Sequence, residues 1–211
     1  MAADYKLALQ ITAQDLASQV IGQFGSKLGD LGKIVAGVGA AGAVFKTLKD
    51  AAGAAAEEEQ GVVRLGQAVK ATGADWDAAS EKIEAYIAKQ TQRAALDDGE
   101  ARDSLAQLTA MTGDYQQALE LLPLTMDMAR GAGMNMAQAG MIVGRVAAGN
   151  TSILTRYGLA VEEGATAQEA LASLQARYAG QAEAYGNTMA GAQDRWRIAI
   201  GNLQETIGGG L

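Results

Sequence analysis

Apolar residues return every three or four positions along residues 16–48, and this spacing constrains the fold more than any other feature of the chain. It is the period of an α-helix with one apolar face, close to the heptad spacing of helices that pack side by side. Glycine interrupts the stretch seven times between Gly22 and Gly42. Each glycine inside a helix costs up to about 1 kcal/mol relative to alanine. A helix of this composition is weak by itself, so we expect its apolar face to pack against a partner.

We therefore predict that this face carries the partner contacts of the chain and that the chain self-associates through the stripe from residue 16 to residue 69, forming a homo-oligomer. A monodisperse monomer in light scattering at high concentration would contradict this. The candidate partner-contact residues are Leu16, Val20, Phe24, Leu28, Leu31, Val35, Val38, Phe45 and Leu48.

The rest of the chain alternates between short apolar-periodic segments and helix punctuation. Polar residues that favour helix N-termini precede these segments, and glycines follow most of them. Thr166 is followed three residues later by Glu169, which is a capping box. The last segment predicts one helix carrying Tyr185, Trp196 and Ile207. The other candidate N-terminal caps are Asp75, Asp97 or Asp98, Asp114 and Asn135, and the predicted stops are Gly73, Gly113, Gly131, Gly149 and Gly158.

Together these patterns predict an all-α fold. A long, Gly/Ala-rich amphipathic N-terminal helix forms an extended arm over residues 1–73, and a bundle of about six shorter helices occupies residues 74–211. The chain has 27 glycines, one proline and 5% aromatic residues. This composition argues against a compact all-β domain, which needs β-branched and aromatic residues between closely spaced turns.

The absence of two residue types limits the chemistry of the chain. Cys and His are both missing, which excludes disulfides, thiolate zinc sites, cysteine nucleophiles and a histidine general base. The net charge is −7 and no cluster of Lys and Arg stands out, so we expect no recognition of nucleic acid sequence. We expect no catalytic residue, no cofactor and no metal site, and predict that the protein is not an enzyme.

One motif suggests a nucleotide. Residues 37–42 spell GVGAAG, a literal GxGxxG, and Glu57 follows. The dinucleotide fingerprint needs a strand before the glycines and an acidic residue at the end of a second strand. Here the preceding residues have helical spacing, and Glu57 comes before the next apolar run. Small residues in a packed helix explain the glycines better.

Other polar and sulfur-containing groups have structural explanations. The pairs Asp75/Asp77, Asp97/Asp98 and Glu162/Glu163 lie mostly at helix starts, where carboxylates satisfy free N–H groups. The methionines between residues 126 and 141 have helical spacing beside Leu and Ile, which favours core filling over an adaptable binding surface. Arg195 and Arg197 flank Trp196, and this favours a buried indole between two solvated arginines over an anion site.

Three stretches resemble the N-terminal region of phage tail tape measure proteins. They are AAGAAAEEEQGVVRLGQAVKATG at 51–73, LLPLTMDMARGAGMNMAQAGMIVGRVAAGNTSILTRYGL at 121–159 and ALASLQARYAGQAEAYGNTMAGAQDRWRIAIGNLQETIG at 170–208. The run from Gly186 through Trp196 to Ile207 is similar to the close of that region. The resemblance covers most of the chain from about residue 50.

The resemblance implies a structural component of the virion, lying inside the tail tube in several parallel copies and found in the host cytoplasm during assembly. It implies that the protein sets tail length while tube subunits polymerise and leaves at DNA ejection. The partners it implies are tail tube and tail tip proteins and a tail assembly chaperone, with host membrane contact during ejection. It implies no catalysis in this region.

Length suggests that the chain is a fragment of a longer tape measure protein, or an unusually short one. A single helix of 211 residues spans roughly 320 Å, less than a long flexible tail, and the end GGGL resembles a cut. The alternative is a cellular helical adaptor or a secreted membrane-inserting helical protein, with residues 25–56 as the inserting part. Liposome leakage would separate these two classes.

Overall fold

The computed structural model describes residues 41–159, 161–162 and 164–209. The chain divides into two compact units, Met1–Asp50 and Ala51–Leu211, and the second unit contains most of the described residues. Every regular element there is a helix, so the all-α prediction is confirmed for this part of the chain. The predicted arm before residue 41 lies outside the described residues.

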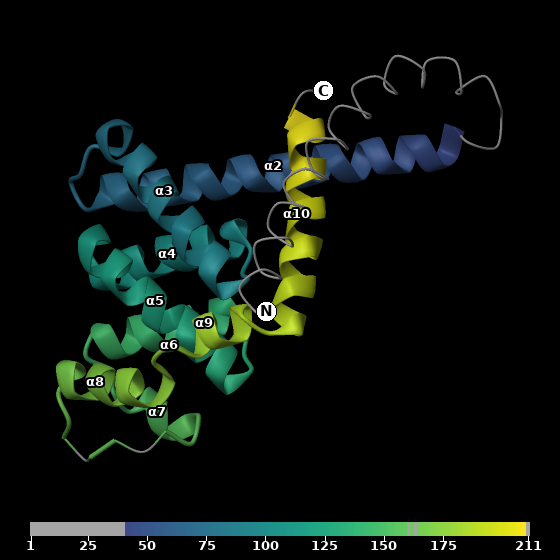
Figure 1. Ribbon diagram of the computed structural model, residues 1–211. Helices are drawn as coiled ribbons and strands as arrows, with labels where there is room; N and C mark the ends of the chain where they lie inside the picture. Colours follow the sequence, from purple (N-terminus) through teal and green to yellow (C-terminus); the bar gives the residue numbers. More distant parts are fainter. Residues whose placement is uncertain (1–40, 160, 163, 210–211) are drawn as a thin grey trace. The chain divides into compact units, whose positions relative to one another are not determined.

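Figure 1 shows the helices in chain order. The first helix described, α2, contains the end of the predicted arm and stops at Ala71, close to the predicted stop at Gly73. The helices are α2 (Ala41–Ala71), α3 (Trp76–Ala94), α4 (Asp98–Thr112), α5 (Tyr115–Ala132), α6 (Met136–Ala147), α7 (Ile153–Arg156), α8 (Ala167–Tyr178), α9 (Gln181–Gly186) and α10 (Met189–Gly209).

The predicted caps are confirmed, and they set where the bundle helices begin. Asp75, Asp97, Asp114 and Asn135 each accept a hydrogen bond from a backbone N–H in the first turn of the helix that follows. Thr166 and Glu169 form the reciprocal capping box of α8. An N-cap bond of this kind contributes about 1 kcal/mol to stability. Asp75 and Asp97, the first residues of two of the predicted carboxylate pairs, are therefore helix N-caps.

The core lies where α4, α5 and α6 pack side by side (Figure 1). Leu108, Leu122 and Ile142 are fully buried there, one from each helix, and each such side chain contributes roughly 1.5–3 kcal/mol. Glycine on α6 lets α4 approach: an added Cβ at Gly144 would lie 2.5 Å from Met111 Sδ. Near-contact of helix backbones through small residues is the role expected of many glycines in this chain.

The methionines and the end of α2 also contribute to this core. Met126, Met128 and Met136 are buried, which confirms the core-filling interpretation for these three. Leu65 and Val69 of α2 are fully buried in the same apolar cluster. The C-terminal part of the predicted arm is therefore packed against the bundle helices within the unit 51–211.

One predicted boundary is wrong. The apolar spacing predicts one helix from Tyr185 onward, but the chain breaks between α9 and α10, where the Thr188 hydroxyl accepts a hydrogen bond from the Gly191 N–H at 3.1 Å. The stop predicted near Gly131 is confirmed: α5 ends at Ala132, and Gly133 takes the left-handed conformation that ends it.

Candidate interaction surface

The predicted partner-contact residues are only partly within the described chain. Residues 16–38 of the stripe lie outside it, Phe45 and Leu48 lie on α2, and the stripe stays a prediction. Glu57 lies in the middle of the same helix, whereas the dinucleotide fingerprint needs an acidic residue at the end of a strand. The fold thus gives no support to the nucleotide interpretation of residues 37–42.

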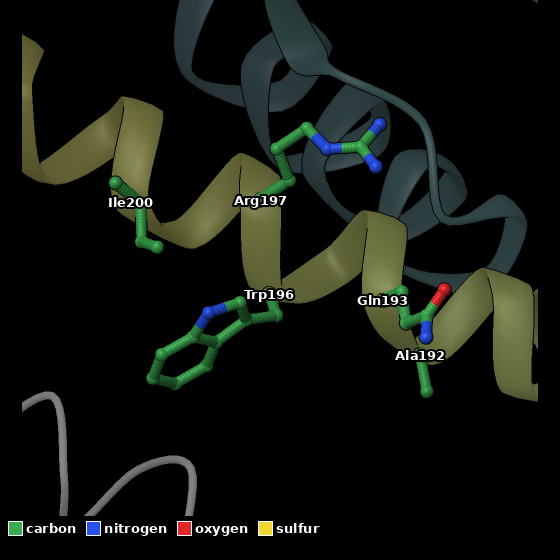
Figure 2. A pocket seen from close by; sticks show the side chains of 5 residues that line it. All are labelled: Ala192, Gln193, Trp196, Arg197 and Ile200. Carbon is green, nitrogen blue, oxygen red and sulfur yellow. The ribbon is translucent and has the colours of Figure 1, made fainter.

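A different apolar surface stands open on α10. Met189 is 78% exposed, Trp196 56% and Ile200 45%, and Ala192 and Leu203, which are part-buried, lie on the same side of the helix. We call these five residues the Trp196 face. Figure 2 shows the indole of Trp196 with the side chains of Ile200 and Ala192 on the same helix. Residues of this face line an open pocket of about 420 Å³.

The exposure of Trp196 corrects the expectation of a buried indole. The two arginines beside it do not flank a core side chain. Arg197 is solvated and forms an ion pair with Asp194 at 3.3 Å, while the Arg195 guanidinium points to the backbone near Gly186. The helix therefore turns its polar and small residues toward the bundle and its largest apolar residue toward solvent.

Asp194, on the opposite side of α10, explains this orientation. Its carboxylate accepts a hydrogen bond from the Tyr185 hydroxyl at 2.7 Å and lies 3.4 Å from the Arg130 guanidinium of α5. The same guanidinium stacks over the Tyr185 ring at 4.0 Å. The hydrogen bond to Asp194 raises the pKa of Tyr185, since it holds the phenol proton in place. These contacts fix the rotation of α10 and leave the Trp196 face outward.

The short helix α9 anchors the start of α10 to the bundle. Asp127 of α5 is buried, and its two carboxylate oxygens accept hydrogen bonds from the Gly180 and Ala182 N–H groups at 3.0 and 2.9 Å. At its other end, Gly186 packs directly against the Arg93 backbone carbonyl, where no side chain would fit. Both contacts hold α9 between α3 and α5.

A buried arginine of α4 joins that helix to two others, α2 and α3. The Arg102 side chain is 4% exposed and forms ion pairs with Glu58 of α2 at 2.7 Å, Glu84 of α3 at 2.9 Å and Asp98 of α4 at 3.2 Å. Burial alone would lower the pKa of Arg102, but the hydrogen bonds and charge of Glu84, with the other carboxylates, hold it above its ordinary value. We call these four residues the Arg102 cluster.

The surroundings of the Arg102 cluster are more acidic than basic. Burial raises the pKa of Glu58, and the charge of Arg102 opposes part of that rise. Glu205 of α10 also has a raised pKa, first through burial and then through the charges of neighbouring carboxylates. Two of the three carboxylates, those of Glu58 and Glu84, come from helices other than that of Arg102, so the cluster contributes to the packing of α2, α3 and α4.

Two further findings concern the described residues, and a third concerns the chain as a whole. None of their helices carries a stretch both long and apolar enough to span a membrane. No group of three or more acidic residues there is arranged to hold a metal ion. Comparison with family models, curated proteins and solved structures gives no match to this chain.

Proposed function

We propose that the chain is part of a phage tail tape measure protein, which sets tail length while the tube polymerises and leaves at DNA ejection. The proposal starts from the resemblance of three stretches, 51–73, 121–159 and 170–208. The helical fold of the described residues is compatible with it, because a ruler built from helices gains about 1.5 Å per residue.

The structural observation that supports the proposal, in addition to the sequence resemblance, is the Trp196 face. It lies in the third resembling stretch, on a helix of 21 residues, and offers apolar surface along a rod. Contact with another protein is one of the roles that exposed apolar patches have, and it is the role that supports this proposal. A component packed among helical copies and tube subunits needs such lateral surfaces, and its partners on this proposal are tail tube and tip proteins and a tail assembly chaperone.

The proposal is tested on the phage or prophage that encodes the chain. Inserting a helical segment of 60 residues in frame after Asp50 adds about 90 Å of helix, and tails measured by electron microscopy should lengthen by a fixed amount of that order. The substitution Val63→Glu at an exposed position leaves the length of the chain unchanged and serves as the control, so its tails should keep the parental length.

Two results would overturn the proposal. Tails of unchanged length after the insertion would show that the chain is no ruler. Absence of the chain from purified particles, checked by mass spectrometry of the tails, would show that it is no virion component. Leakage from liposomes on adding the purified chain would favour the alternative of a membrane-inserting helical protein.

A further inference from the structure

The spacing of the Trp196 face has a symmetry that sequence periodicity alone does not require. Counted from Trp196, its members lie at −7, −4, 0, +4 and +7. At 100° per residue all five fall within about 40° of the Trp196 direction on the helix. A helix turned end over end about Trp196 therefore presents the same row of apolar positions.

Charge is absent from this row. The nearest charged residues, Arg195 and Arg197, point about 100° away from Trp196 on either side. Arg197 is already paired with Asp194, and the Arg195 guanidinium lies near Gly186, on the bundle side. The face can therefore be covered without burying an unpaired charge, which would be costly.

We propose that the Trp196 face of one chain packs against the Trp196 face of a second copy, with the two α10 helices antiparallel and the two-fold axis at Trp196. In this order Met189 faces Leu203 of the partner copy, and Ala192 faces Ile200. The two Trp196 side chains face each other at the centre in either order of the helices. In the antiparallel order, each layer beside them joins a larger and a smaller or two similar side chains, so the flanking layers differ less in thickness. A parallel pair would set Ala192 against Ala192 and Ile200 against Ile200, giving one thin and one thick layer. Such interlocking of large and small side chains is what close helix packing requires.

The exposed area indicates a weak, concentration-dependent pair. Trp196, at 56% exposed, offers on the order of 130 Å². The whole face offers a few hundred Å² per copy, comparable with the functional patches of about 300–600 Å² found on monomers. Two such faces bury less than the roughly 1,200 Å² of a specific, stable interface. The pair is therefore reversible and depends on concentration.

This inference does not depend on the proposed function. If the chain is a tape measure protein, copies inside a tube are expected to be parallel. The antiparallel pair would then belong to the free chain, where it covers an apolar surface until assembly supplies other neighbours.

The absence of Cys from the chain makes the order of the helices measurable by disulfide formation. Two full-length variants, Met189→Cys and Leu203→Cys, are oxidised separately and as a mixture. In the antiparallel pair, positions 189 and 203 are opposite each other, whereas two copies of position 189 are about 21 Å apart along the helix axis. A disulfide needs Cα atoms within about 7 Å.

The mixture should therefore give a covalent dimer, and each variant alone should not. Dimers from each variant alone would establish a parallel pair and overturn the proposal. No covalent dimer in any sample, at a concentration where the uncrosslinked chain is shown to self-associate, would equally overturn it.

A second measurement separates this contact from self-association through the predicted N-terminal stripe. Sedimentation velocity of the full chain with Trp196→Glu should show a dissociation constant raised at least tenfold. Val63→Glu is the matched control, because Val63 is 54% exposed on another helix, and it should leave the constant unchanged. Circular dichroism confirms that both variants keep their helices. Equal constants for the two variants would overturn the proposal.

Discussion

Replacing Arg102 by alanine should unfold the bundle far more easily than replacing the exposed Arg64 in the same way. Both arginines join α2 and α4 through carboxylates: Arg64 binds Asp103 at 2.7 Å, with side chains 52% and 50% exposed, whereas the Arg102 side chain is 4% exposed. An exposed pair of this kind contributes about 0–1 kcal/mol. Removing one partner from a buried pair costs about 3–5 kcal/mol, because the remaining charge is left uncompensated.

The expected cost of Arg102→Ala is somewhat smaller than for a fully buried pair. The carboxylates of Glu58, Glu84 and Asp98 are 28%, 33% and 29% exposed, so water solvates part of the charge left behind. We expect a loss of about 2–4 kcal/mol for Arg102→Ala and at most about 1 kcal/mol for Arg64→Ala. Urea unfolding at pH 7, followed by circular dichroism, measures both.

The pH dependence gives the sharper check. Without Arg102 the charge that opposes the raised pKa of Glu58 is lost, so the pKa of Glu58 in the folded variant should rise above that in the parent. The folded variant then binds protons more readily as pH falls, so its deficit relative to the parent should shrink between pH 7 and about pH 4.5. A loss no larger than that of Arg64→Ala, or a deficit that stays constant with pH, would refute the reasoning.

Three other substitutions, with Gly53→Ala as a control, test contacts of α9 and α10. Gly186→Ala should destabilise the fold by more than about 2 kcal/mol, because the new methyl group meets the Arg93 backbone carbonyl. Gly53→Ala lies in open space on α2 and should stabilise the fold by about 0.5–1 kcal/mol. Thermal unfolding of the two variants measures the difference. Asp127→Ala leaves two N–H groups of α9 without their acceptor and should cost about 2 kcal/mol, with hydrogen exchange showing the loss of protection in α9. Glu205→Gln removes a carboxyl group whose pKa is raised in the folded protein. Such a group destabilises the fold once the pH rises through its folded pKa. The free energy of unfolding of the variant should therefore exceed that of the parent by less than about 1 kcal/mol at pH 7, and should equal it near pH 4 in the same urea assay.

Helix starts were predictable because a cap is local chemistry. Asp114 and Asn135 each bond an N–H two or three residues away, so the pattern of a short polar residue before an apolar run carries the information. The break before α10 has a local signal too, in Thr188, but the uninterrupted apolar spacing from Tyr185 to Trp196 outweighed it. Periodicity detects a helical face, and two helices in succession can share one period.

The Arg102 cluster could not be predicted in the same way. Its members on three helices, Glu58, Glu84 and Arg102, lie 18 to 44 residues apart, and nothing in their local sequence distinguishes them from solvated charges. Only the packing of α2, α3 and α4 brings them together.

The error at Trp196 shows which signal decides how a Gly-rich helix docks. Apolar spacing suggests that the largest residue of α10 faces the core, but an indole needs a cavity of its own size, whereas glycine needs only a neighbouring backbone. Gly191 packs against the Tyr185 carbonyl and Gly208 against the backbone of Ala51, both on the side of α10 away from Trp196. When glycines and a large apolar residue occupy opposite faces of one helix, the glycine face can approach the rest of the chain more closely and exclude water there. Docking through the glycine face also immobilises fewer side chains than docking through the face with the large residue, so it costs less side-chain entropy. The large residue then stays available for another molecule, so the glycines of such a helix predict its internal contact and its aromatic residue predicts its external one.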